Sequence, residues 1–213
     1  MPPIESKRVL VGYFGPYGGK SSNAAEETVN QLAAAEQAGM LNVPADVEVE
    51  FFCLERDVDS VDRFISAAQT HQVGKVLLLG ENLGPLKVES LARDRGVPPR
   101  NVLVSAGTAF WRHGSGGALA TDAPVAEMAA AAGARLSSDA GTDYCNYVYY
   151  RALKAGLNAV FVHVNAGLFE HFRDIDGAAR GVNAMLGAWF SHSPSLATHV
   201  RGVDAMYPRT GSE

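Results

Sequence analysis

The sequence contains little cysteine and no long hydrophobic run. Only two of its 213 residues are cysteines, Cys53 and Cys145, and two are too few for a disulfide framework. Apolar runs such as Val76–Leu79 are far too short to cross a bilayer. The first eight residues lack the charged and apolar regions of a secretory signal. We therefore expect a cytoplasmic protein with reduced thiols and no membrane partner.

An excess of positive charge is also missing. Lys and Arg number 18 against 23 Asp and Glu, which gives a formal net charge of −5. Such a balance argues against nucleic acid as a partner, because binding phosphates needs a basic face. The six histidines show no HExxH or paired Cys/His spacing, so no metal site is expected. The glycine-rich loop 15–19 lacks the P-loop and GxGxxG spacings, so no nucleotide or other cofactor is expected.

What the sequence does contain is an alternation of apolar strands and amphipathic helices. Strands are predicted at 8–14, 47–54, 75–80 and 158–164, and helices at 23–38, 58–71, 124–132, 143–155 and 176–190. The stretch 83–101 is interpreted as mostly loop, 102–104 as a short strand or hairpin arm, and the tail from about 191 carries little pattern. The alternation predicts an α/β layer fold with a central, largely parallel sheet, and one domain over 1–213.

Cys145 lies where a thiol could be activated. It falls at the start of the predicted helix 143–155, for which Thr142 or Asp143 is the candidate N-cap. The positive end of a helix lowers a thiol pKa, and its free N–H groups can hold an oxyanion. A buried, inert cysteine is an equally good interpretation of this context. For Cys53, inside an apolar strand, the inert interpretation is clearly better.

His163 is the candidate base. It lies at the end of the predicted strand 158–164, only 18 positions after Cys145. The start of a helix and the end of the strand that follows it meet at the carboxyl edge of a parallel sheet, where sites form. On spacing alone, a core histidine with its hydrogen bonds satisfied is the better interpretation. Four carboxylates could orient the ring, and the sequence alone does not choose among them: Glu81, Glu89, Asp94 and Asp143.

Several of these segments together resemble the pyroglutamyl peptidase I family, also called pyrrolidone-carboxylate peptidases. Residues 14–19, FGPYGG, resemble the family's opening GFEPFGG. Residues 139–147, DAGTDYCNY, are similar to its nucleophile motif NTAGTYVCN, and residues 161–164, FVHV, to its histidine motif FIHVP. Residues 79–92 are similar to GQAGG…ERVA. The matches run in the same order from residue 8 to about 190.

The resemblance implies a cysteine peptidase that removes an N-terminal pyroglutamyl residue. In this family pattern Cys145 is the nucleophile, His163 the base and acid, and Glu89 the carboxylate that orients His163. The implied fold is a three-layer α/β/α sandwich, and family members are often homotetramers. We therefore expect a peptide or small-molecule substrate and a possible homodimer or homotetramer, with neither metal nor cofactor.

The resemblance also predicts the substrate pocket and marks where it has changed. Phe14 and Tyr17 match the aromatic residues that enclose the pyrrolidone ring. Glu81, which replaces a family glutamine, and Tyr144, beside the nucleophile, are further expected substrate contacts. The Glu81–Glu89 segment is two residues shorter than usual.

The stretch after Ala92 departs most from the family. It lacks the family arginine that polarises the reacting carbonyl, and Arg93, Arg95 and Arg100 are the candidates to replace it. The Gly, Pro and Arg content of 93–117 would suit a mobile lid.

These departures keep two other functions open. One is the same triad acting on a different amide, lactam or thioester, by hydrolysis, acyl transfer or cyclisation. The other is a non-catalytic binding protein, which the intact Cys–His–Glu set argues against.

Overall fold

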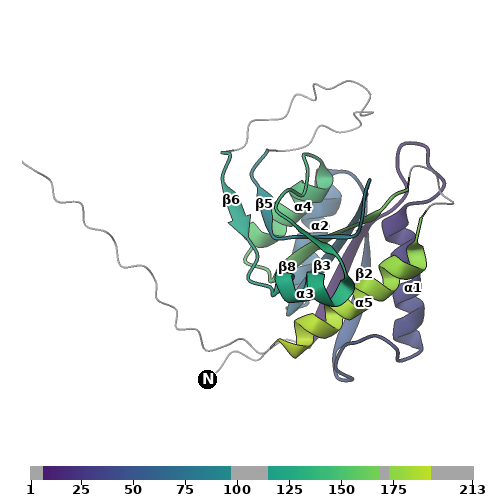
Figure 1. The fold of residues 1–213 in the computed structure, drawn as a ribbon. Helices are drawn as coiled ribbons and strands as arrows, with labels where there is room; N and C mark the ends of the chain where they lie inside the picture. Colours follow the sequence, from purple (N-terminus) through teal and green to yellow (C-terminus); the bar gives the residue numbers. More distant parts are fainter. Residues whose placement is uncertain (1–6, 97–114, 168–172, 193–213) are drawn as a thin grey trace, which may run out of the picture.

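The structure is a computed structural model that describes residues 7–96, 115–167 and 173–192. Its strands are β1 (Arg8–Phe14), β2 (Glu48–Leu54), β3 (Lys75–Asn82), β4 (Lys87–Glu89), β5 (Leu91–Arg93), β6 (Ala118–Ala120), β7 (Arg135–Ser137) and β8 (Ala159–Asn165). Its helices are α1 (Ala24–Gln37), α2 (Val58–Thr70), α3 (Val125–Ala132), α4 (Tyr144–Lys154) and α5 (Ile175–Ser191). Figure 1 shows the strands at the centre with helices on both sides.

The main sheet has six strands in the order β2-β1-β3-β8-β4-β7. Strands β2, β1, β3 and β8 are parallel, whereas β4 runs antiparallel to β8 and parallel to β7. The parallel strands are rich in Val, Leu and Phe, as expected for strands covered on both faces. In the parallel pair β3–β8, Gly80 lies opposite His163, close to the carboxyl edge.

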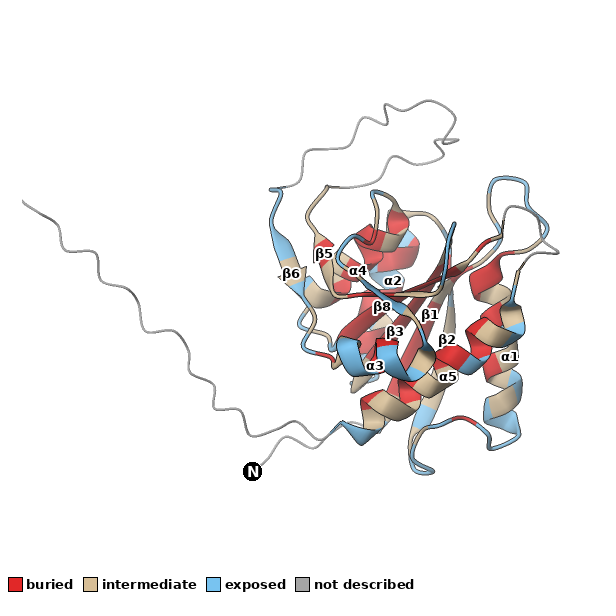
Figure 2. Cartoon of the chain, in the orientation of Figure 1, coloured by how far each residue is buried: buried red, intermediate tan, exposed pale blue. Residues whose placement is uncertain are grey.

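Alternate residues of the central strands enter two separate cores. Leu77 and Val162 face the core beneath α1, α3 and α5, whereas Leu78 and Phe161 face the core beneath α2 and α4. Because side chains alternate along a strand, each central strand supplies both cores. The buried strands and the exposed outer sides of the helices are visible in Figure 2. The predicted three-layer α/β/α sandwich with a mostly parallel sheet is therefore confirmed.

The stretch 83–101 is where the prediction was wrong. It contains two short strands instead of a loop, β4 in the main sheet and β5, which pairs with β6 in a separate antiparallel ribbon. Each strand has only three residues, so neither gives a readable alternation pattern in the sequence. The expected strand at 102–104 lies outside the described residues. The strands β6 and β7 were also missed for the same reason.

Candidate active site

Cys145 is the second residue of α4, and its thiol rests against the sheet. The N-cap of α4 is Asp143, whose carboxylate accepts a hydrogen bond from the Tyr144 N–H at 2.8 Å. A Cβ atom built on Gly80 would lie 2.8 Å from Sγ of Cys145. The absent side chain of Gly80 thus leaves the space that the thiol occupies. Since Gly80 is the in-register neighbour of His163, the thiol lies beside the imidazole.

His163 and Glu89 form a buried pair across the β8–β4 junction. Nδ1 of His163 lies 2.9 Å from Oε1 of Glu89, and these residues are 3% and 0% exposed. A carboxylate can only accept, so this contact assigns the proton of the neutral ring to Nδ1 and leaves Nε2 free to accept a proton. The other oxygen of Glu89, Oε2, has no hydrogen-bond partner among the described residues.

The other three carboxylates considered from the sequence bind elsewhere. Glu81 forms an ion pair with Lys20, Asp94 accepts a hydrogen bond from Ser115 Oγ at 2.7 Å, and Asp143 forms an ion pair with Arg56. Of the four, Glu89 is the one in contact with the His163 ring.

A pocket of about 220 Å³ opens at this edge of the sheet. Residues from the loop after β1, from the end of β3 and from the start of α4 line it together with Cys145 and His163. All four expected substrate contacts are among its walls, namely Phe14, Tyr17, Glu81 and Tyr144. Glu89 lies behind His163 and does not line the pocket. The volume is below the roughly 300–1,000 Å³ typical of drug-sized ligands, so the pocket suits one small group.

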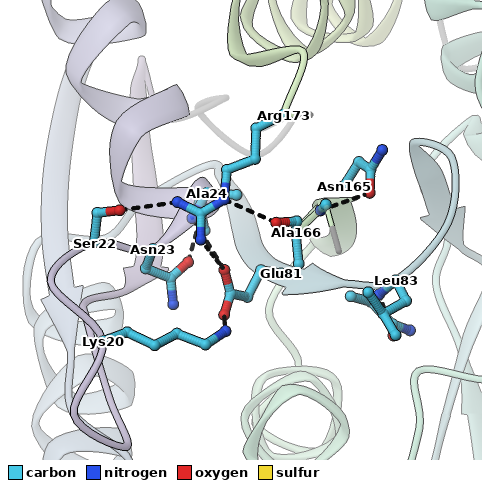
Figure 3. Close-up of polar contacts among 12 residues, drawn as sticks. Lys20, Ser22, Asn23, Ala24, Glu81, Leu83, Asn165, Ala166 and Arg173 are labelled. Carbon is cyan, nitrogen blue, oxygen red and sulfur yellow. Dashed lines mark hydrogen bonds and ion pairs between the residues drawn. The ribbon is translucent and has the colours of Figure 1, made fainter. Parts of the chain in front are cut away.

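The Glu81 wall of the pocket is part of a buried charge network, shown in Figure 3. The Glu81 side chain is 2% exposed; one oxygen pairs with Lys20, and the other accepts the Ala24 N–H at 3.1 Å. Arg173, also almost fully buried, approaches the same carboxylate at 4.0 Å and donates to the Ala166 carbonyl at 2.8 Å. Glu81 thus joins the glycine-rich loop, α1 and the segment before α5 at one point.

Tyr17 is held between this network and the pocket. Nζ of Lys20 lies 5.0 Å from the centre of its ring, and the Arg56 guanidinium lies 4.4 Å from it. Burial, followed by the nearby Glu81 carboxylate, raises the pKa of the Tyr17 hydroxyl above its usual value. Tyr17 therefore stays protonated across the physiological range and can donate a hydrogen bond.

Arg56 is a pocket residue that the sequence analysis did not single out. It follows β2 and precedes α2, at the same carboxyl edge as Cys145 and His163. Its position two residues after an apolar strand was the signal that could have found it, because such positions face the site edge of parallel sheets. The pocket also contains Asn82, at the last position of β3, for which the same signal applied.

The arginines expected to polarise a carbonyl do not reach the pocket where they are described. The backbone of Arg93 exchanges two hydrogen bonds with the Asn146 amide, and Arg95 pairs with Asp139 at 3.3 Å. Neither lines the pocket, and Arg100 lies outside the described residues. Of the candidate arginines, those described are therefore placed away from Cys145, and Arg56 is the arginine that lines the pocket.

The charge state of Cys145 differs from the expectation drawn from its helix position. Burial, with the Asp143 carboxylate as the next cause, raises the pKa of the thiol to about 12, while Arg56 lowers it. This direction is opposite to the one expected from the helix position, because burial disfavours the charged thiolate. A thiol of this kind reacts by giving up its proton to a base during attack instead of existing as a thiolate beforehand.

The described part of the chain contains neither a candidate metal cluster nor a membrane-spanning helix. Within residues 7–96, 115–167 and 173–192, no group of three or more His, Cys, Asp or Glu side chains could hold a metal ion. No helix in those ranges is long and apolar enough to cross a membrane.

Comparison with known proteins finds similarity to pyrrolidone-carboxylate peptidases. No protein-family model matches the chain. The pyrrolidone-carboxylate peptidase of Vibrio vulnificus (strain CMCP6) is 25% identical over 185 aligned residues, which cover 74% of this chain and 78% of the relative. This relative is an enzyme, which agrees with the enzyme expected from the sequence.

Solved structures show the same fold at lower identity. Pyroglutamyl peptidase I from Bacillus amyloliquefaciens superposes with a TM-score of 0.68 and 18% identity, covering 88% of this chain and 96% of that chain. Pyrrolidone carboxyl peptidase from Thermus thermophilus gives 0.66 and 21%, covering 84% and 99%. The resemblance is therefore confirmed: the chain is similar in sequence to a pyrrolidone-carboxylate peptidase and has the fold of solved pyroglutamyl peptidase I structures.

Proposed function

We propose that the chain is a cysteine peptidase that removes a pyroglutamyl residue from the N-terminus of peptides. Cys145 is the nucleophile, His163 the general base and acid, and Glu89 the carboxylate that orients His163. The observation that carries the proposal is the buried His163–Glu89 pair, whose His163 lines the same small pocket as Cys145. The relatives, which are named as peptidases of this specificity, support the same conclusion.

The first half of the reaction forms an acyl-enzyme. Nε2 of His163 takes the thiol proton as Sγ of Cys145 attacks the carbonyl carbon, which gives a tetrahedral oxyanion. Backbone N–H groups at the start of α4 are the donors for this oxyanion, and one such donor contributes roughly 3–4 kcal/mol in comparable sites. The intermediate then collapses: the C–N bond breaks, and His163 passes its proton to the leaving amine.

The second half hydrolyses the thioester. Nε2 of His163 takes a proton from water, whose oxygen attacks the acyl carbon. The C–S bond breaks, the free acid leaves, and the proton on His163 returns to the Cys145 sulfur. Glu89 stabilises the imidazolium formed in both halves and keeps the proton of the neutral ring on Nδ1.

The pocket walls favour a small, flat acyl group. Phe14, Tyr17 and Tyr144 present aromatic surface, and the volume admits one small residue while the remaining peptide extends outside. The Glu81 carboxylate, to which the Tyr17 hydroxyl is hydrogen-bonded, offers a hydrogen-bond acceptor for the N–H of a lactam ring.

The test is a steady-state assay of wild type and Cys145→Ser with a fluorogenic pyroglutamyl amide. We expect turnover by wild type and a loss of at least about 10³-fold in the variant, because the alcohol is a far weaker nucleophile than the thiol in this setting. Cys53→Ser is the matched control and should keep wild-type activity. Equal activity in Cys145→Ser and wild type would refute the proposal.

A second candidate function keeps the triad and changes the acyl group. The observation that favours it is the pair of ionic side chains in the pocket wall, Glu81 and Arg56. The same assay with acetyl and prolyl amides and with short acyl thioesters distinguishes the two. Faster Cys145-dependent turnover of any of these than of the pyroglutamyl amide would replace the first candidate by the second.

A further inference from the structure

Arg56 is fixed over the pocket by three neighbours. Its guanidinium forms an ion pair with Asp143 and lies 4.4 Å from the centre of the Tyr17 ring and 5.8 Å from that of Tyr144. The side chain is 25% exposed, so solvent screens its charge only in part. These three contacts come from two parts of the chain, Tyr17 and the adjacent Asp143 and Tyr144, and they hold one flexible side chain in place, which indicates a defined role for its charge.

Asp143 has two tasks that conflict at this position. One carboxylate oxygen caps α4 by accepting the Tyr144 N–H, and the other pairs with Arg56. The cap needs an acceptor here, but a negative charge two residues before Cys145 opposes the build-up of negative charge on its sulfur. An arginine bound to that carboxylate removes the conflict.

We propose that Arg56 is a positioning residue for the nucleophile: its guanidinium binds the Asp143 carboxylate at the cap of α4 and cancels a charge that would oppose ionisation of Cys145. The inference rests on the proposed function, because it bears on catalysis only if Cys145 is the attacking group. The effect acts through Asp143 and through the field at the sulfur, and the thiol proton still passes to His163.

Other charged and titratable groups also face the Cys145 sulfur. The experiment must distinguish their effects on the thiol pKa from those of Arg56 and Asp143. Glu81, at the end of β3, raises the pKa of the Cys145 thiol, and its own charge is paired with Lys20. His163 lies beside the thiol on β8, and Tyr17 faces it from the loop after β1. Substitution at Arg56 and Asp143 changes none of these side chains, although Arg56→Gln also removes the guanidinium that lies over the Tyr17 ring.

The experiment is a double-mutant cycle read out by thiol chemistry. In a Cys53→Ser background, the variants Arg56→Gln, Asp143→Asn and their combination react with iodoacetamide, a neutral reagent, across a range of pH. Arg56→Gln should raise the apparent pKa of Cys145 by about one unit, which slows alkylation roughly tenfold at neutral pH. Asp143→Asn keeps an N-cap side chain and should speed alkylation by a similar factor. The combined variant should return close to the parent rate.

Two further variants separate charge from structure. Arg56→Lys keeps the positive charge and should stay within a few-fold of the parent, whereas Arg63→Gln, an exposed arginine on α2, removes a charge away from the pocket and should change nothing. An effect of Arg56→Gln no larger than that of Arg63→Gln would overturn the proposal. So would a combined variant as slow as Arg56→Gln alone, or an Asp143→Asn rate equal to the parent's.

This readout needs no substrate, so it is independent of the test of function. If the pyroglutamyl amide is not cleaved but the four alkylation rates of the double-mutant cycle follow the expected pattern, the proposed function fails and the role of Arg56 in thiol ionisation stands. If the amide is cleaved through Cys145 but Arg56→Gln alkylates at the parent rate, only the present inference fails.

Discussion

Glu89 is the most deeply buried of the three proposed triad residues. It is fully buried, one oxygen contacts His163, and the other has no partner in the described part of the chain. A buried polar atom without a partner usually costs about 1–3 kcal/mol, so stability alone does not explain a carboxylate at this position. Orientation of the His163 ring is an explanation in keeping with the proposed mechanism.

Replacing Glu89 by Gln should therefore reduce activity much more than stability. The amide keeps the size of the side chain but loses the charge that stabilises the imidazolium, so we expect kcat to fall by about 10²–10⁴. Glu127→Gln, at an exposed position on α3, is the control and should have wild-type kcat. A Glu89→Gln enzyme within a few-fold of wild type would mean that His163 needs no carboxylate.

The raised pKa of Cys145 makes a separate prediction about pH. Burial raises the pKa of this thiol to about 12, so we expect its alkylation rate to keep rising, nearly tenfold per unit, from pH 7 to 10. Mass spectrometry of the Cys145 peptide measures the rate separately from that of Cys53. A plateau of the alkylation rate near pH 8.5, where an unperturbed cysteine titrates, would contradict a raised pKa for Cys145.

Single residues also show what the sequence could and could not predict. The motifs around Cys145 and His163 selected two groups that the fold brings together, because both lie at ends of elements whose type was readable. Glu89 could not be chosen by residue pattern alone, since it lies on a three-residue strand, and it came from the family resemblance. Arg56 was missed because its role depends on Asp143 and Tyr17, which are distant in sequence.

At the scale of elements, the site depends on how closely α4 approaches β3. A Cβ on Gly80 would lie 2.8 Å from both the Cys145 sulfur and the Phe161 ring, distances that side chains do not tolerate. Gly80 has an ordinary backbone conformation, so the requirement for glycine comes from space and not from φ. The strand thus has to lack a side chain at the point where the Cys145 thiol lies against it.

Gly80→Ala should displace the thiol and lower kcat by more than about tenfold, with a loss of roughly 1–3 kcal/mol of stability from overpacking. Gly12→Ala is the comparison, since its Cβ would also clash, 2.6 Å from the Phe64 ring, but in the core away from the pocket. It should lose stability while the folded fraction stays active. Equal kcat in folded Gly80→Ala and wild type would show that the α4–β3 approach does not position Cys145.

Elements of at least seven residues were predictable and shorter strands were not. Strands β1, β2, β3 and β8 and the five helices in the described part of the chain were predicted within about two residues, because their periodicity spans several turns or alternations. The four missed strands have three residues each and exist through tertiary pairing. For β4, that pairing is with β8 and β7, and no local pattern encodes it.

At the scale of the whole molecule, the two cores share one sheet. Leu77 and Leu78 are neighbours on β3, both fully buried, and they enter opposite cores. A fold built in this way should unfold as one unit, which is also what the predicted single domain requires.

Leu77→Ala and Leu78→Ala should each cost about 2–5 kcal/mol and shift one common unfolding transition. Denaturant unfolding measures this when it is followed by circular dichroism and, in a Trp111→Phe background, by the fluorescence of Trp189, which belongs to only one of the cores. Separate transitions for the two probes, or a variant that shifts only one of them, would contradict a single cooperative domain. The possible homodimer or homotetramer stays a prediction that sedimentation equilibrium can measure in the same samples.

The central claim is that the Cys145 sulfur carries the acyl group. The most direct measurement is to quench wild-type protein in acid during turnover of a pyroglutamyl amide and to locate the adduct by peptide mass spectrometry. We expect a 5-oxoprolyl thioester on the peptide containing Cys145, absent from Cys145→Ser and from protein without substrate. Turnover with an adduct on another residue, or undiminished turnover by Cys145→Ser, would contradict it.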